Sequence, residues 1–263
     1  IVISGISTNS KEIKKNNIFF ALKGSKLNGE KFIQEAIIKG AAVIVCSKSC
    51  KIINNKVLII KKKDNLRLFL SEIASKFYNL KPKNIIAVTG TNGKTSVADI
   101  FYQIFRINNL PVASIGTLGI KYNGRIIKTN LTSPDTITLH KSLHFLKKEK
   151  IENVIIETSS HGLHQKRLHN IKFKGAIFTN FSQDHLDYHK TMKSYLNAKL
   201  VLFKEILKKN SWVISDKEIK PFLQIKKIAQ KKALKLFHIN NELEQIKRTL
   251  QAPGSNFKMK NLA

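Results

Sequence analysis

The segment formed by residues 84–108, N-I-I-A-V-T-G-T-N-G-K-T-S-V-A-D-I-F-Y-Q-I-F-R-I-N, limits the possible folds of this chain more than any other. Residues 85–88 are an apolar run that is long enough for a buried strand. After two glycines, apolar residues recur at helical spacing, namely Val97, Ile100, Phe101, Ile104 and Phe105. A strand, a glycine loop, Lys-Thr and a helix form a phosphate-binding arrangement, because successive backbone amides and the positive end of the helix dipole face the same anion.

The glycine loop has a shortened spacing. It consists of Gly90, Thr91, Asn92, Gly93, Lys94, Thr95 and Ser96. We expect Lys94 to reach the outer phosphates of a nucleotide and Thr95 to place its hydroxyl on Mg²⁺. The common nucleotide-binding loop has four residues between its glycines, whereas here only Thr91 and Asn92 stand between them. This spacing weighs against an ordinary GTPase or kinase and favours a family with a shortened loop; a strand-helix turn without a ligand is the alternative.

The composition bounds the partners of the chain. Its 263 residues suffice for one large or two medium domains. A formal net charge of +30 and a pI near 10.1 would ordinarily suggest a nucleic-acid partner. The lysines are, however, spread from end to end among many Ile and Asn residues, with no basic arm that carries interleaved aromatics. We therefore expect no nucleic-acid partner and keep a basic polyanion-binding protein as an alternative.

The cysteines and the apolar runs indicate the compartment. Cys46 and Cys50 are too few for a disulfide scaffold and lack the paired spacing of a zinc site, so reduced thiols are expected. No run approaches 18 apolar residues and no signal peptide opens the chain, which predicts a cytoplasmic protein without a membrane span. The chain lacks an initiator Met and stops at residues 261–263 in what reads as the opening of a helix, so both ends are expected to be cut.

The apolar pattern divides the chain into two α/β parts at Lys81-Pro82-Lys83. A polar joint with a proline, directly before the nucleotide-binding strand, is a natural domain boundary. We predict a small N-terminal α/β domain over residues 1–82 and a P-loop domain with a mainly parallel sheet over residues 83–263. In the first domain, strands are predicted at residues 17–22 and 42–46 and helices at residues 32–39 and 66–80.

The second domain reads as a doubly wound parallel sheet. Strands are predicted at residues 112–115, 120–122, 153–156 and 173–178, and helices from near Ile137, with Pro134 in its first turn, and from Tyr195 to Leu207. Ligands of such sheets bind at the carboxyl ends of the strands. The loop at Gly90, the carboxylate of Glu157 and residues 180–189 should therefore converge on one site.

Several side chains near these strand ends have two interpretations. Glu157 is either a Mg²⁺ ligand or a helix cap. His185 and His189 stand four apart, which suggests zinc, but Leu186 occupies the place where the metalloprotease pattern needs Glu, so a magnesium or phosphate contact from His185 is favoured. The remaining histidines are interpreted as surface or structural residues: His140, His144, His164, His169 and His238.

Three further features are ambiguous from the residues alone. Lys199 is one lysine among many and is expected to be solvated. Gln165 and Arg167 either clamp a carboxylate, since Arg offers a planar fork, or are structural. In residues 4–11, S-G-I-S-T-N-S-K, turn chemistry is favoured over a small ligand site.

These motifs resemble the Mur ligase family, the ATP-dependent amide ligases that build the peptide stem of bacterial peptidoglycan. The resemblance rests on T-G-T-N-G-K-T-S (residues 89–96) and T-N-F-S-Q-D-H-L-D-Y-H (residues 179–189). E-T-S-S-H-G-L (residues 157–163) is similar to the members that add the third stem residue, meso-diaminopimelate or L-lysine, to UDP-N-acetylmuramoyl-L-alanyl-D-glutamate. S-T-N-S-K (residues 7–11) and K-G-S-K-L-N-G (residues 23–29) resemble the uridine-binding first domain.

The resemblance implies a role for particular residues. ATP would bind residues 90–96, with Lys94, Lys199 and His185 as catalytic residues. One Mg²⁺ would be held by Thr95 and Glu157, and a second by His185 and by Lys199 as a carbamate. Ser10 would contact the UDP moiety. The muramoyl dipeptide would be held by Thr132, Ser133, Ser159, Gln165 and Arg167.

The resemblance also implies a mechanism, in which an acyl phosphate forms from ATP and is attacked by the amine of the incoming amino acid. The implied protein is a monomer whose partners are small molecules, with diaminopimelate favoured over lysine. Family members carry a C-terminal ligase domain, which this chain is expected to lack, so that the central sheet is expected to be incomplete. Asn28 replaces a more usual acidic residue or His, and Ser96 replaces a frequent Thr. Another P-loop ATP-dependent enzyme is the alternative.

Overall fold

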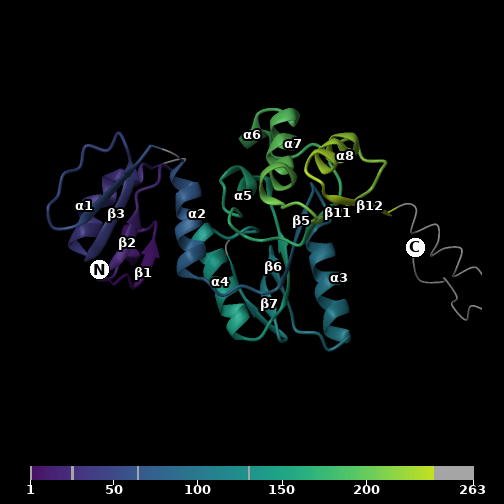
Figure 1. Ribbon diagram of the computed structural model, residues 1–263, viewed down its shortest axis with the longest axis horizontal. Coiled ribbons are helices and arrows are strands. Elements are labelled where there is room, and N and C mark those ends of the chain that lie inside the picture. The colour runs from purple at the N-terminus through teal and green to yellow at the C-terminus, as the bar shows by residue number, and fades with distance from the viewer. Residues whose placement is uncertain (1, 25–26, 64, 130, 240–263) are drawn as a thin grey trace, which may run out of the picture.

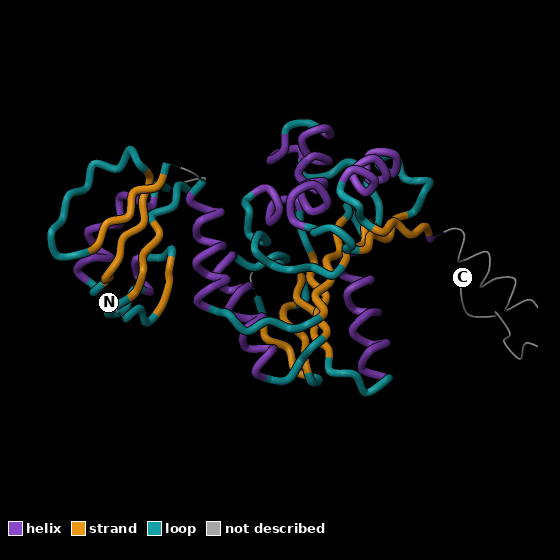
Figure 2. Tube along the Cα trace, in the orientation of Figure 1, coloured by secondary structure: helices purple, strands orange, loops and turns teal. Residues whose placement is uncertain are grey.

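The fold consists of two sheets with helices packed on their faces. The computed structural model describes residues 2–24, 27–63, 65–129 and 131–239. Within these residues the strands form one sheet of four strands and one of eight. Figures 1 and 2 show the smaller sheet beside the larger one, with α2 (Leu66–Phe77) between them. The predicted α/β class, a small N-terminal sheet followed by a larger one, is confirmed.

The small sheet is held between two helices. Its parallel strands, in order, are β1 (Gly5–Ser7), β2 (Asn17–Phe20), β3 (Ala41–Ser47) and β4 (Leu58–Lys62). Successive side chains of a strand point to opposite faces, so Phe19 packs with Ile33 of α1 (Ile33–Ile38) and Phe20 with Leu70 of α2. The sequence predicted β2, β3 and both helices, but not β1 or β4.

The large sheet is mainly parallel, as predicted. Its order is β12-β11-β10-β5-β9-β6-β7-β8, and among these strands only the pairs β6–β7 and β7–β8 are antiparallel. The strands are β5 (Asn84–Thr89), β6 (Val112–Gly116), β7 (Gly119–Tyr122), β8 (Arg125–Ile127), β9 (Asn153–Glu157), β10 (Gly175–Phe178), β11 (Trp212–Ser215) and β12 (Lys235–His238).

Helices cover the two faces of the large sheet unequally (Figure 1). On one face, Ala98 of α3 (Lys94–Ile107) is buried against Val88 and Ile155. The larger core on the other face includes residues of α4 (Thr136–Lys148), α5 (Ser160–His164), α7 (Met192–Val201) and α8 (Phe222–Lys231). The strands between these layers are apolar on both sides, as β5 and β9 show, which is typical of a parallel sheet.

The predicted helix over residues 195–207 is two elements. It begins earlier, as α7, because the hydroxyl of Thr191 accepts a hydrogen bond from the N–H of Ser194 (3.1 Å) and caps the helix. After Val201 the chain forms the π-helical turn η3 (Leu202–Ile206), which the sequence did not predict.

The helix predicted to begin near Ile137 is α4. Its cap is Asp135, whose Oδ1 accepts hydrogen bonds from the N–H groups of Ile137 (2.9 Å) and Thr138 (3.0 Å). Pro134 therefore precedes the cap, so its predicted place in the first helical turn is wrong.

The two sheets are joined through α2. The hydroxyl of Ser75 donates a hydrogen bond to the carbonyl of Asn170 (3.3 Å), and Ser71 likewise bonds the carbonyl of His169. In the sequence, α2 follows the last strand of the small sheet. Its hydrogen bonds to residues 169 and 170 connect it to the part of the chain that forms the large sheet. A domain boundary after residue 82 therefore stays a prediction.

Candidate nucleotide-binding site

The glycine loop lies between the carboxyl end of β5 and the start of α3. Gly93 caps α3 in the left-handed region, with φ of 80°, and Gly90 has φ of 149°. A Cβ at Gly90 would lie 1.9 Å from Oγ1 of Thr179. Both positions therefore require glycine, one for its backbone conformation and one also for a close approach.

A second loop, which follows β10, holds the glycine loop in place. The N–H of Thr91 donates to the carbonyl of Asn180 (3.0 Å), and the N–H of Asn92 donates to Oδ1 of the same residue (2.8 Å). In return, Oγ1 of Thr179 donates to the carbonyl of Asn92 (2.6 Å). Thr91 is buried, and its Oγ1 accepts the N–H of Ser182 (3.0 Å). These bonds bring together two segments that the sequence separates by about ninety residues, as predicted from their positions at the carboxyl ends of strands.

Lys94 folds back over its own loop. Its Nζ donates to the carbonyls of Gly90 (3.1 Å) and Thr91 (2.6 Å). Burial lowers the pKa of Lys94, while the negative charges of Glu157 and Asp184 act in the opposite direction. The ammonium group is therefore held next to the loop amides, where an anion would meet both.

Glu157 ends β9 and is buried among hydroxyl and amide donors. Its Oε2 accepts hydrogen bonds from Oγ1 of Thr95 (2.8 Å) and Oγ1 of Thr117 (3.1 Å), and its Oε1 accepts the N–H of Thr117 (3.0 Å). A Cβ at Gly116 would lie 1.9 Å from Oε1 of this carboxylate, so the backbone of β6 forms one wall of the site. The cap of the following helix α5 is Ser159. The helix-cap interpretation of Glu157 is therefore wrong.

Lys199 is buried, with 1% of its surface exposed, although its residue type predicted a solvated side chain. It lies on α7, and its Nζ donates to the carbonyl of Gly90 (2.6 Å) and lies 4.4 Å from the ring centre of Tyr195. Burial and, to a smaller extent, the charge of Lys94 lower the pKa of Lys199 to about 7. Two lysines thus converge on one carbonyl oxygen, an arrangement that disfavours the charged form of the more deeply buried one.

His185 and His189 have different surroundings. His185 is exposed, has φ of 53° and precedes the short helix α6 (Leu186–His189), and its ring borders the same cavity as Lys199. His189 is buried, and its Nε2 lies 3.0 Å from Oγ of Ser160. Burial and neighbouring histidines lower the pKa of His189 to about 4, so it is neutral near pH 7.

The five positions expected to hold the dipeptide lie in one connected group. Oγ of Ser133 accepts the N–H of Ser159 (2.9 Å). The guanidinium of Arg167 donates to the carbonyl of Ser133 (2.7 Å) and, through Nε and Nη2, to Oε1 of Gln165 (3.1 and 2.7 Å). Oγ1 of Thr132 lies 3.1 Å from Oγ1 of Thr117, which also binds Glu157. The group therefore reaches from the carboxylate of β9 to the half-buried arginine.

Ser10 lies apart from this group, in the small-sheet part of the molecule. It is buried, and its Oγ donates to Oε2 of Glu35 (2.7 Å). In the same segment Oδ1 of Asn9 accepts the N–H of Lys11 (3.0 Å), and Oγ of Ser7 accepts the N–H of Asn9 (2.9 Å). These bonds are the turn chemistry that the residues predicted. A contact of Ser10 to a ligand stays a prediction.

The cavity at the strand ends has a volume of about 240 Å³. It is lined by Thr91, Asn92, Gly93, Lys94, Thr95, Ser96, Thr117, Thr132, Glu157, Ser159, Ser160, His185 and Lys199. Sequence reasoning missed Thr117, which binds both oxygens of Glu157. The signal that could have found it is its place directly after β6, at the same sheet edge as the glycine loop.

His140 and the two cysteines are buried and do not line the cavity. His140 is buried in α4, and its burial lowers its pKa to about 3. Cys46 and Cys50 are buried free thiols. No helix within the described ranges is both long and apolar enough to span a membrane.

A glycine loop at the carboxyl edge of a parallel sheet, with a lysine and a carboxylate facing it, defines the class of P-loop nucleotide-binding α/β proteins. Residues 88–261 match the model of the Mur ligase middle domain, and residues 2–78 match that of the Mur ligase family, catalytic domain. The chain belongs to the Mur ligase family.

Curated relatives of the chain are named as one particular ligase of this family. The UDP-N-acetylmuramoyl-L-alanyl-D-glutamate–2,6-diaminopimelate ligase of Rickettsia conorii (strain ATCC VR-613 / Malish 7) is 38% identical over 98% of this chain and 55% of its own length. The ligase of the same name from Zymomonas mobilis subsp. mobilis is 38% identical over 99% of this chain and 53% of its own length. A solved structure with this ligase name aligns with a TM-score of 0.76 at 28% identity, over 90% of this chain and 48% of that one. The chain spans about half the length of the curated relatives it matches.

Proposed function

We propose that the protein to which this chain belongs is an ATP-dependent amide ligase of peptidoglycan precursor synthesis. It joins a diamino acid, with meso-diaminopimelate favoured over L-lysine, to UDP-N-acetylmuramoyl-L-alanyl-D-glutamate. The observation that carries the proposal is the convergence of the shortened glycine loop, Glu157 and the buried Lys199 on one cavity. The family and the relatives' names support the same choice.

The proposal divides the binding work between two domains. Residues 1–82 bind the uridine diphosphate end of the precursor, with Ser10 among the contacts. Residues 83–263 bind ATP and the dipeptide end. The five residues expected to hold the dipeptide, which include Arg167, lie beside the glycine loop. Their position supports this division, because the D-glutamate carboxylate has to reach the outer phosphate of ATP.

The glycine loop binds the ATP phosphates in this proposal. Residues 90–96 supply amides at the N-terminus of α3, and Lys94 already lies against the loop carbonyls. A phosphate group placed at the loop would offer the ammonium group a charged partner in exchange for two neutral ones. Lys94 thereby lowers the free energy of the negative charge that gathers at the transferred phosphate.

The residues around Glu157 fit a magnesium ion. Mg²⁺ prefers oxygen ligands, and the carboxylate of Glu157 and the hydroxyl of Thr95 are hydrogen-bonded oxygens that face the same cavity. Bound Mg²⁺ would supply positive charge for the phosphates. Thr117 fixes the carboxylate through two hydrogen bonds, so that it is oriented before any ion binds.

Lys199 is proposed to act as a carbamate. A neutral amine reacts with CO₂ to give a carbamate anion and one proton, and the pKa of Lys199, lowered by burial to about 7, leaves a large share of this amine neutral near pH 7. The anion so formed would join His185 as a ligand for a second Mg²⁺ at the cavity. As an ammonium ion, the same side chain would repel a cation.

The reaction would proceed in two steps on this scaffold. A carboxylate of the D-glutamate attacks the γ-phosphate of ATP, which releases ADP and forms an acyl phosphate. The amine of the diamino acid then attacks the acyl carbon, so that an amide bond forms and phosphate leaves. Arg167, held by Gln165 and Ser133, keeps two of its five N–H groups for the substrate after the hydrogen bonds that it makes within the protein.

The proposed protein is a cytoplasmic monomer with small-molecule partners and no nucleic-acid partner. Another P-loop enzyme would instead transfer phosphate to a hydroxyl group. The distinguishing measurement is incubation of the full-length protein with ATP, Mg²⁺, the UDP-muramoyl dipeptide and diaminopimelate or lysine, with mass spectrometry of the products. A tripeptide product with one ADP per amide bond is expected. ADP with a phosphorylated substrate and no amide product would overturn the proposal.

A further inference from the structure

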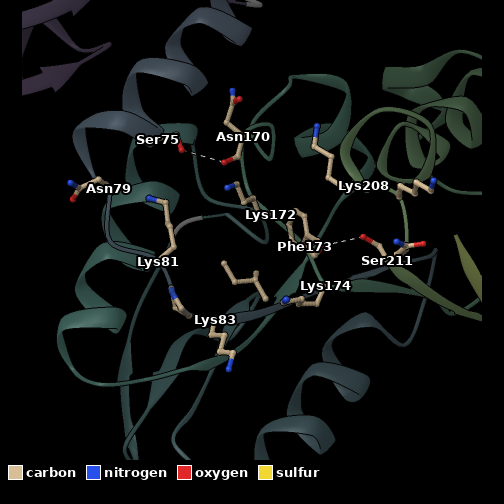
Figure 3. Close-up of a pocket in the computed structure, with 14 residues that line it drawn as sticks. Ser75, Asn79, Lys81, Lys83, Asn170, Lys172, Phe173, Lys174, Lys208 and Ser211 are labelled. Atoms are coloured by element: carbon tan, nitrogen blue, oxygen red, sulfur yellow. Dashed lines mark hydrogen bonds between the residues drawn. The ribbon is translucent and has the colours of Figure 1, made fainter. Parts of the chain in front are cut away.

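A second cleft lies at the opposite edge of the large sheet from the glycine loop, and its volume is about 730 Å³. Figure 3 shows its walls. They are formed by the segments that precede three neighbouring strands, residues 81–83 before β5, residues 170–174 before β10 and residues 208–211 before β11. Ser75 of α2 and Asn79, two residues after its end, complete the lining. The cleft is about three times as large as the cavity at the glycine loop.

Lysines dominate the lining of this cleft. The six are Lys81, Lys83, Lys172, Lys174, Lys208 and Lys209. They make up six of its 14 lining residues, whereas the whole chain has 42 lysines in 263 residues. No Asp or Glu is among the lining residues. A uniformly lysine-rich composition alone would give about two lysines at such a site, so the fold concentrates charge that the sequence appeared to spread evenly.

Strand pairing brings the lysines together. The N–H of Lys174 donates to the carbonyl of Ile85 (2.8 Å), and the N–H of Trp212 donates to the carbonyl of Lys174 (3.1 Å). The three segments therefore enter the sheet side by side, about 5 Å apart. Figure 3 shows Lys172 and Lys174 near the middle of the lining, with Lys83 and Lys208 on opposite sides of them.

The acidic group beside Lys83 is shared with a lysine outside the cleft. Glu152 forms an ion pair with Lys147, and its Oε2 accepts the main-chain N–H of Lys83 (2.9 Å). That carboxylate is therefore already matched by a cation outside the cleft. The neutral hydroxyls of the lining are also engaged, because Ser75 donates to the carbonyl of Asn170 (3.3 Å) and Ser211 to that of Phe173 (3.2 Å).

Lys81 is the least exposed of the six lysines. Its ammonium group is partly buried, and Nζ donates to the carbonyls of Tyr78 and His140. Burial lowers the pKa of Lys81 to about 8, and no carboxylate acts in the opposite direction. An anion in the cleft would offset this cost of burying a cation.

We propose that this cleft binds a small, multiply charged phosphate compound, of the inorganic polyphosphate or nucleoside polyphosphate kind, at a site separate from the glycine loop. The volume is that of a small-molecule pocket. Its cations are all lysines, which bind phosphate groups as point charges, and six of them can meet several phosphate groups at once. The ligand contacts both parts of the molecule, since α2 and the strand-entry segments share the cleft.

The test measures binding of sodium tripolyphosphate by calorimetry to the full-length protein that carries Lys94→Ala. This substitution removes one of the two lysines at the glycine loop, which weakens phosphate binding there relative to the cleft. Adding Lys83→Gln, Lys174→Gln and Lys208→Gln should weaken binding roughly tenfold or more, since three charge contacts are lost. The matched control carries Lys226→Gln, Lys227→Gln and Lys231→Gln on α8, which change the net charge equally and should leave the affinity unchanged.

Further arms identify the ligand chemistry. Equal affinity for tripolyphosphate and ATP would mean that the cleft recognises only the phosphate groups. Tighter binding of ATP than of tripolyphosphate would indicate that the ligand is a nucleoside polyphosphate. Equal weakening by the cleft and control variants would reduce the effect to general charge attraction and overturn the proposal. Tighter binding of citrate, or of a single-stranded oligonucleotide, with the same cleft dependence would also overturn it. Ligation activity reports on the glycine loop, so its outcome is independent of this one.

Discussion

The two edges of the large sheet both collect lysines, but they hold them in different ways. At the carboxyl edge, Lys94 and Lys199 are bonded to carbonyl groups of the glycine loop and share the carbonyl of Gly90. At the amino edge, most of the six cleft lysines are exposed side chains on strand-entry segments. Buried cations held at fixed positions are suited to chemistry at defined atoms. A larger number of exposed cations is suited to binding a multiply charged anion.

The strongest test of the carboxyl edge is Lys94→Ala in the full-length protein. We expect ATP-dependent ligation to fall by roughly 10²- to 10³-fold or more, because the negative charge at the transferred phosphate loses its positioned cation. The measurement is the rate of ADP release and tripeptide formation. Lys141→Ala, an exposed lysine of α4, is the control and should retain the rate. Ligation by Lys94→Ala at the normal rate would show that the transferred phosphate does not need this lysine.

The second test asks whether Lys199 acts as an anion. Lys199→Ala should reduce ligation by about 10²-fold, and a small carboxylate such as formate or acetate in solution should restore part of the rate. Lys193→Ala on the same helix α7 is the control, since Lys193 is exposed. Loss of activity without rescue at any carboxylate concentration would contradict the carbamate, and an unchanged rate would contradict any role for this lysine.

The fold could be predicted further than the site because the two rest on different signals. Apolar runs located β5 and β9, since each buries a continuous apolar stretch. Helical spacing located α3, although Ile100 and Ile104 of its apolar stripe are exposed. β4 was missed: it carries Lys61 and Lys62, and its side chains are only partly buried. The burial of Lys199 could not be predicted from its residue type, because it depends on the packing of α7 against the distant glycine loop.

The candidate site was predicted where a motif fixes geometry locally, and missed where the geometry is tertiary. The glycine loop and Glu157 follow from strand ends, which the sequence indicates. Thr117 was missed because it has no motif of its own and acquires its place through the pairing of β6 with β9. The lysine cleft was missed for the same reason, since its members come from three separate segments.

The third test addresses the wall of the carboxyl-edge site. Gly116→Ala should destabilise the protein by about 1–3 kcal/mol, because the new Cβ would overlap Oε1 of Glu157, now 1.9 Å from that position. Chemical denaturation measures the free energy of unfolding. In a Glu157→Ala background the same change should cost much less, because the overlapping carboxylate is gone. An equal loss of unfolding free energy with and without Glu157→Ala would mean that the backbone at Gly116 does not position the carboxylate of Glu157.

The smallest expected effect is a pH dependence of stability that only the buried cation should produce. The pKa of Lys199 in the folded protein is lowered by burial to about 7, below the ordinary value of 10.5 that applies to the unfolded chain. Between these values the unfolded state binds a proton that the folded state does not, so the free energy of unfolding rises with pH. Below pH 7 both states are protonated, and the destabilising effect of the buried charge is fully present.

Lys199→Met keeps most of the side-chain volume and removes the titration. The difference in unfolding free energy between the parent and Lys199→Met, measured from pH 6 to pH 9, should therefore shift in favour of the parent as the pH rises, whereas the parent and Lys193→Met should differ by a constant amount. A carbamate that had formed under the conditions of measurement would mask the amine, so CO₂-free buffer is used. A flat difference for Lys199→Met in that buffer would show that the amine is not buried as a cation, and the contrast between the two edges of the sheet would then lose its physical basis.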